Sequence, residues 1–138
     1  MNAALEFHDS TLSSVVTVGT DCVLRFDGYL HQSQGRAGVD PGTGWQCLVE
    51  LRLRQGRRDG SVPELPVALS DGTLHLGASV FENCVPIPLQ DLRATRIELI
   101  AVSGERVVFT GASLEAALVT EPKYVDTFPG AGPEYEQP

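Results

Sequence analysis

The stretch Trp45-Gln-Cys-Leu-Val-Glu-Leu-Arg-Leu-Arg54 alternates between apolar and polar side chains along its length. Its odd positions are Trp45, Cys47, Val49, Leu51 and Leu53, whereas its even positions are mostly polar. A β-strand has this period of two when one face packs against a core and the other faces water. The segment therefore predicts a half-buried strand in a β-rich protein, with Trp45 among the core residues.

Two further segments predict hairpins. Val67–Leu76 contains Asp71-Gly72, a dipeptide that favours the left-handed backbone of a two-residue turn. A turn there pairs Leu69 with Leu74 on the apolar face. Farther along, a second hairpin is predicted to join 96–102 to 106–110, and its two apolar faces favour a central position in the sheet.

A third hairpin is predicted from Leu12 to about His31, with two registers to consider. A three-residue turn at 19–21 places Val18 opposite Cys22 and keeps the apolar residues on one face. A two-residue turn at 19–20 places Val18 opposite Asp21 and mixes polar with apolar neighbours. The first register is preferred, because a slip of one residue would turn the core set to the wrong face.

The remaining segments complete an all-β pattern. Ser113–Thr120 follows a bend at Gly111 and is ambiguous: its residues favour a helix, but it is short and ends in β-branched residues, so a strand is preferred. The prolines of Asn83–Leu89 predict an extended segment at an edge of the sheet or outside it. Seven or eight mostly antiparallel strands are typical of a β-sandwich, with a closed β-barrel as the alternative. We expect one domain over 1–130, including a packed closing segment at 123–130, and a loose tail over 131–138.

Composition limits the classes of function. The chain has 138 residues, of which 42% are apolar and 20% charged, as in a folded globular domain. No apolar run is long enough for a membrane span, and no signal peptide is evident. The formal net charge of −8 argues against nucleic acid or an anionic membrane as the main partner.

The cysteines are Cys22, Cys47 and Cys84, an odd and widely spaced set. They predict buried, reduced thiols and a cytoplasmic protein, because a disulfide framework or a zinc site usually brings paired cysteines. The standard catalytic motifs are also missing from the sequence, so no catalytic residue is predicted.

One candidate ligand-binding face follows from the preferred register of the third hairpin. In that register Asp9 lies opposite His31, on the same face as Arg25 and Tyr29. A carboxylate beside an imidazole can orient the ring for binding. His8 and Asp9 are adjacent on a strand and point to opposite faces, so no metal site and no cofactor are predicted.

The tetrapeptide Phe7-His8-Asp9-Ser10, near the start of a small β-rich chain, resembles the opening of several families of uncharacterised bacterial proteins. Some of those families are of the immunity type, which bind and neutralise a toxin. The ending Tyr124–Gly130 is similar to endings in the same kind of protein. The resemblance implies a non-catalytic module that binds an unknown protein partner. The alternatives are a small-ligand or metal-binding β-sandwich that uses the Asp9/His31 face, and a homodimer formed through a strand edge.

Overall fold

The described part of the chain is built from β-strands. The computed structural model describes residues 2–128, and within that range there is no helix, hence none long and apolar enough to cross a membrane. The predicted all-β class is confirmed. The strands are β1 (Asn2–Val18), β2 (Asp21–Ser33), β3 (Gly42–Arg54), β4 (Arg57–Asp59), β5 (Val67–Leu76), β6 (Ser79–Glu82), β7 (Cys84–Pro86), β8 (Leu89–Asp91), β9 (Thr95–Ala101), β10 (Arg106–Gly111), β11 (Ser113–Leu118) and β12 (Lys123–Phe128).

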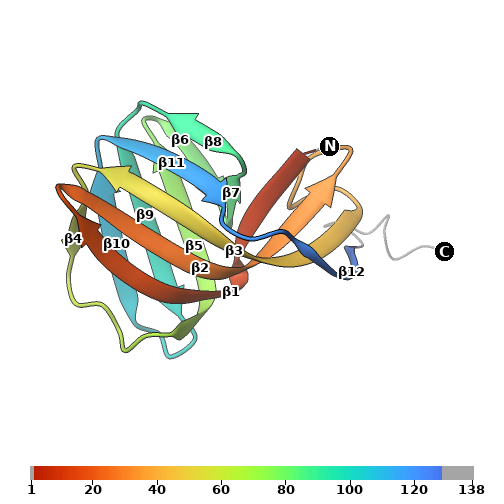
Figure 1. Ribbon diagram of the computed structural model, residues 1–138, viewed down its shortest axis with the longest axis horizontal. Helices are drawn as coiled ribbons and strands as arrows, with labels where there is room; N and C mark the ends of the chain where they lie inside the picture. Colours follow the sequence, from red (N-terminus) through yellow and green to blue (C-terminus); the bar gives the residue numbers. More distant parts are fainter. Residues whose placement is uncertain (1, 129–138) are drawn as a thin grey trace.

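These strands form one antiparallel sheet that curls into a half-barrel. Neighbouring strands follow the order β4-β10-β9-β5-β1-β2-β3-β11-β8, while β12 pairs with β3, β6 with β5 and β7 with β1. Figure 1 shows the long strands β1, β2 and β3 crossing in front of β5, β9 and β10. β5 links the two halves, since Val67 and Ala68 pair with β1 whereas the stretch from Leu69 onward pairs with β9.

The alternation predicted for β3 is confirmed. Four inward residues of this strand are buried in the core: Cys47, Val49, Leu51 and Leu53. Trp45 is only partly buried, and its ring meets the ring of Tyr124 edge-on at 5.6 Å between centroids. The long apolar face of β3 thus provides one wall of the core.

The predicted hairpin formed by β9 and β10 is also confirmed, with Arg106 opposite Ile100. β9 lies between β10 and β5, in the interior of the sheet.

The segment Ser113–Thr120, for which the sequence left helix and strand open, contains the strand β11. Gly111 is the last residue of β10, and an added Cβ there would lie 2.9 Å from the Cβ of Leu53. A glycine at this point lets the chain pass close to β3.

The hairpin predicted at Asp71-Gly72 is wrong, because β5 continues through this dipeptide as one strand. The chain reverses later, at Gly77 with a φ of +56°, where Leu76 pairs with Ser79 of β6. Gly72 is needed for space, since an added Cβ would lie 2.6 Å from ring atoms of Phe7. The turn-like dipeptide therefore marks a close contact between an aromatic ring and the backbone.

The preferred register of the hairpin predicted from Leu12 to about His31 is wrong as well. Val18 lies opposite Asp21 across a two-residue turn, which is the alternative register. Val16 and Val18 are consequently exposed, at 49% and 46%, on the outer face of the sheet. Before these valines, β1 contains two irregularities in its pairing with β2, and they return its apolar residues to the core.

Two peripheral segments lie where the sequence indicates. β7 pairs only with β1 among the described strands, in keeping with an edge segment that contains prolines. β12 runs along β3 from Lys123 to Phe128, so this part of the predicted closing segment does lie against the body. Its residues Tyr124 and Val125 are nevertheless about half exposed, at 57% and 49%. The predicted tail at 131–138 lies outside the described residues.

The contact between Phe7 and Gly72 makes a prediction about stability. Gly72→Ala is expected to lower the free energy of unfolding by about 1–3 kcal/mol, because the new methyl group overlaps the ring. In a Phe7→Ala background the same substitution should cost less, because alanine lacks the Cγ and Cδ2 atoms that lie 2.6 Å from the new methyl group. Urea unfolding of the four proteins measures this coupling. Strictly additive effects would show that the ring does not constrain Gly72.

Candidate functional site

β1 contains a bulge with several extra residues between two of its pairs with β2. The last pair before it joins Glu6 to Tyr29, and the first pair after it joins Thr11 to Asp27. The residues Phe7-His8-Asp9-Ser10 therefore face only the one residue of β2 between those pairs, a glycine. We call these four residues the β1 bulge. Bulges bend a strand and redirect its side chains, so this one decides which groups reach the surface.

The β1 bulge is anchored from the inside and from the side. Phe7 is fully buried, with its ring 6.0 Å from the ring of Phe26. Its backbone N–H donates to the carbonyl of Asn83 at 3.1 Å, and the N–H of His8 donates to Oδ1 of Asn83 at 2.7 Å. Asn83 is the single residue between β6 and β7, and both its backbone carbonyl and its side chain help to fix the bulge.

Hydrogen bonds from Ser10 replace part of the interrupted ladder. Its hydroxyl donates to the carbonyl of Glu6 at 2.5 Å and accepts the N–H of Tyr29 at 3.0 Å. The opposing residue Gly28 also fits a close contact, since an added Cβ would lie 2.6 Å from Cδ1 of Leu5. The bulge is therefore a defined structure, in which the N–H groups of Phe7 and His8 and the hydroxyl of Ser10 all form hydrogen bonds.

The tip of the bulge faces solvent. Asp9 has a φ of +76°, a left-handed conformation that aspartate tolerates better than most residues. The side chains of His8 and Asp9 are 58% and 57% exposed, with 3.3 Å between Nδ1 and Oδ2. The two polar side chains of the tetrapeptide are thus presented together at the surface.

The predicted contact between Asp9 and His31 does not form. His31 lies opposite Ala4 on β1 and opposite Gly44 on β3. The hairpin register is already shifted at its turn, and the extra residues of the bulge move Asp9 farther from this position. His31 is fully buried, and its Nδ1 accepts a hydrogen bond from the N–H of Gly38. This histidine secures the loop between β2 and β3.

The other two predicted site residues are also separated from each other. Arg25 forms an ion pair with Glu50 of β3 at 2.9 Å, between the bulge and the turn. The hydroxyl of Tyr29 donates to Oδ1 of Asp126 on β12 at 2.9 Å. Burial is the main cause of the raised pKa of Tyr29, and Asp126, Glu6 and Asp9 add to it. The structure therefore groups Asp9 with Tyr29 and leaves Arg25 and His31 elsewhere.

Glu6 is the residue of this region that the sequence did not reveal. It is only 7% exposed, and on neighbouring strands it pairs with Tyr29 and Cys84. Within residues 2–128, no hydrogen bond or ion pair to its carboxylate is present. The pKa of Glu6 is raised to about 7, mainly by burial and then by the charge of Asp9; His8 opposes the rise and Asp126 adds to it.

Together these groups form an acidic face, which we define as Glu6, His8, Asp9, Tyr29 and Asp126. Its members come from β1, β2 and β12. Across the described range, no group of three His, Cys, Asp or Glu side chains is arranged to hold a metal ion. The face can accept hydrogen bonds and can pair with a single organic cation such as a lysine or arginine side chain.

The thiols add no reactive group. Cys22, Cys47 and Cys84 are free, the first two buried and the third partly buried. Burial is the largest cause of the raised pKa of each thiol, and at Cys84 the charge of Glu6 adds to it. Because the thiolate is the nucleophile, all three are poor nucleophiles at neutral pH.

The pKa of Glu6 predicts how stability depends on pH. The folded protein retains this proton up to about pH 7, whereas the unfolded chain releases it near the ordinary value of 4.5. The group therefore reduces stability as pH rises through this window. Glu6→Gln is expected to raise the free energy of unfolding by up to about 3 kcal/mol at pH 8 and by little at pH 4.5.

Urea unfolding across this pH range measures the effect, with the exposed Glu64→Gln as a matched control. A loss of stability in Glu6→Gln at every pH would contradict the burial of a carboxylate without a partner.

Comparisons with known proteins leave the site to be interpreted from its own geometry. No protein-family model, no curated protein and no solved structure matches the chain. The resemblance of Phe7–Ser10 to bacterial immunity-type openings therefore stays a prediction. The tetrapeptide does have a defined role in this fold, since it forms the β1 bulge.

Proposed function

We propose that this chain is a non-catalytic protein-binding module that uses the acidic face to hold a basic side chain of a partner protein. The observation that carries the proposal is Glu6, a residue only 7% exposed whose carboxylate forms no hydrogen bond or ion pair within residues 2–128 and keeps some contact with solvent. Asp9 and Asp126 lie near enough for their charges to raise its pKa. A cation of suitable shape would complete this arrangement.

The energetics support a binding role over a structural one. A buried carboxylate without a partner is costly, and the neighbouring negative charges increase that cost. Natural proteins retain such a group where a ligand supplies the missing charge. A lysine or arginine from a partner would restore the ionised form of Glu6 and gain charge-assisted hydrogen bonds.

A protein is a better candidate than a small cation. Asp9 is presented on an exposed bulge, and Asp126 lies on an exposed strand that pairs with β3. Such a protruding surface suits contact with another surface. The net charge of −8 would also speed the approach of a basic partner.

The immunity type is the specific form that we propose, with a basic bacterial toxin as the partner and the cytoplasm as the location. The resemblance of the β1 bulge to immunity-type openings supports it, as do the free cysteines. The binding surface would lie on a β-sandwich or on a closed barrel. The single hydrogen-bonded path from β4 to β8 favours one curled sheet over two packed sheets, although β4 and β8 do not pair with each other.

The alternative of a ligand or metal on an Asp9/His31 face has no comparable support, because β1 places Ala4 opposite His31. A homodimer through a strand edge would use β4 or β8, the two ends of the described strand order, or β12 beside β3. All three are short strands, and the residues of β4 are exposed.

Capture from a lysate of the native host tests the proposal. Immobilised wild-type protein is expected to retain a specific partner that salt displaces, since exposed ion pairs are screened. The double variant Asp9→Asn with Asp126→Asn should reduce its recovery about tenfold or more. Asp59→Asn, an exposed aspartate on β4, is the matched control.

Quantitative mass spectrometry of the captured proteins gives the result. Equal recovery on wild type and on the double variant would contradict the acidic face as the binding surface. Loss of the same partner with the Asp59→Asn control would show a general charge effect, which also counts against the proposal.

A further inference from the structure

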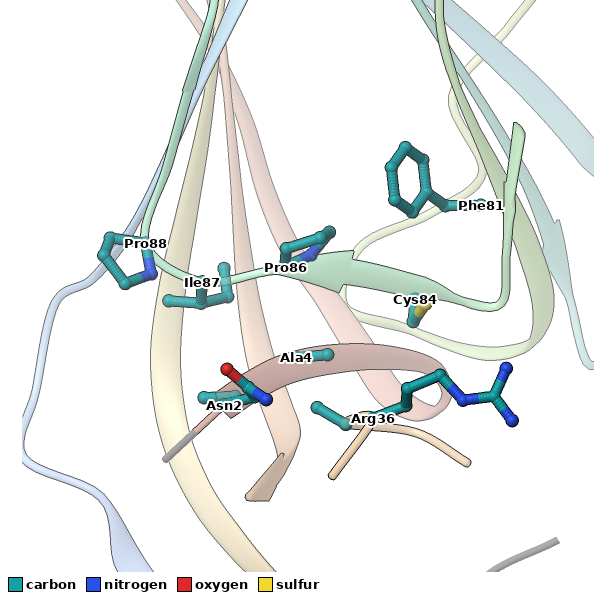
Figure 2. A pocket seen from close by; sticks show the side chains of 10 residues that line it. Asn2, Ala4, Arg36, Phe81, Cys84, Pro86, Ile87 and Pro88 are labelled. Carbon is teal, nitrogen blue, oxygen red and sulfur yellow. The ribbon is translucent and has the colours of Figure 1, made fainter. Parts of the chain in front are cut away.

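A concave site lies beside the acidic face, on the side of β7. Its volume is about 470 Å³, within the range of small-molecule sites. Figure 2 shows Pro86, Ile87 and Pro88 along one side of it, and Asn2, Ala4 and Arg36 along the other. The full lining consists of Asn2, Ala3, Ala4, Arg36, Ala37, Phe81, Cys84, Pro86, Ile87 and Pro88. We call it the Arg36 cleft.

The charge of the Arg36 cleft is opposite to that of the whole chain. Its lining contains one cation and no carboxylate, in a protein with a net charge of −8. Burial raises the pKa of the Cys84 thiol, so this group carries no negative charge at neutral pH. The rest of the lining is mostly apolar, with the amide of Asn2 as a further polar group. An anionic group therefore finds one attractive position here.

The guanidinium of Arg36 is available to a ligand. Its side chain is 78% exposed, and Nε lies 3.9 Å from Oδ2 of Asp40, at the outer limit of an ion pair. The same carboxylate oxygen accepts the backbone N–H of Arg36 at 2.6 Å. Asp40 thus shapes the loop through the backbone and leaves most donors of the guanidinium unoccupied.

We propose that the Arg36 cleft binds a small monocarboxylate with a compact apolar body. The apolar body would lie on Phe81, Pro86 and Ile87, and the carboxylate would pair with the guanidinium of Arg36. A planar guanidinium recognises a carboxylate through two parallel hydrogen bonds, which sets the orientation of the ligand. The site is separate from the acidic face, so it does not depend on the proposed protein partner.

Two probes of equal shape test the proposal: 3-phenylpropionate and its neutral analogue 3-phenylpropionamide. Each is titrated into ¹⁵N-labelled protein, and amide shifts of Ala3, Ala4 and Ala37 report on the cleft. The carboxylate is expected to give saturable shifts at millimolar concentration. The amide should bind about tenfold more weakly, because it lacks the charge that pairs with Arg36.

Variants identify the residue responsible. Arg36→Gln is expected to weaken binding of 3-phenylpropionate about tenfold or more, whereas Arg36→Lys should retain part of the affinity. Arg57→Gln, on the exposed strand β4, is the matched control and should bind as wild type does. Arg36 lies in an exposed loop, so unchanged amide shifts away from the cleft will show that the variants fold.

Three results would overturn the proposal. Equal affinity for the carboxylate and the amide would mean that the cleft does not recognise charge. Unchanged affinity in Arg36→Gln would remove the guanidinium from the site. The absence of saturable shifts at Ala3, Ala4 and Ala37 up to millimolar carboxylate would show that the cleft is not a binding site.

Discussion

Four residues of β1, Phe7–Ser10, are accommodated opposite the single residue Gly28 of β2, and the outer face of the protein depends on this mismatch. The inner side of the bulge is held by Phe7, which packs on Phe26 and over the backbone of Gly72. Because the ring fills the core, the following residues are directed to the surface. One buried aromatic contact thus positions the exposed polar groups of His8 and Asp9.

The same mismatch explains why two unlike surfaces lie side by side. Directly before the bulge, Glu6 pairs with Tyr29 on one side and Cys84 on the other. Tyr29 also hydrogen-bonds to Asp126 of β12, whereas Cys84 lines the Arg36 cleft. β1 therefore separates the face that we propose for a cation from the cleft that we propose for an anion. This separation favours two independent ligands over one shared site.

The sequence allowed prediction of the strands whose signals are local. The alternation along β3 and the hairpin of β9 and β10 depend on neighbouring residues, so they could be recognised. The role of Gly72 could not, because it is set by a ring distant in the sequence. The register of β1 against β2 depends on contacts of the bulge with Phe26 and Asn83, which no local pattern records. Glu6 escaped notice because its burial comes from neighbouring strands.

The register of β1 against β2 is the most direct test of this account. Cross-strand nuclear Overhauser effects between backbone protons of labelled protein report which residues lie opposite each other. The account predicts contacts of Glu6 with Tyr29 and of Thr11 with Asp27, and none between Asp9 and His31. A continuous register that brings Asp9 opposite His31 would remove the bulge, and with it the basis for the acidic face.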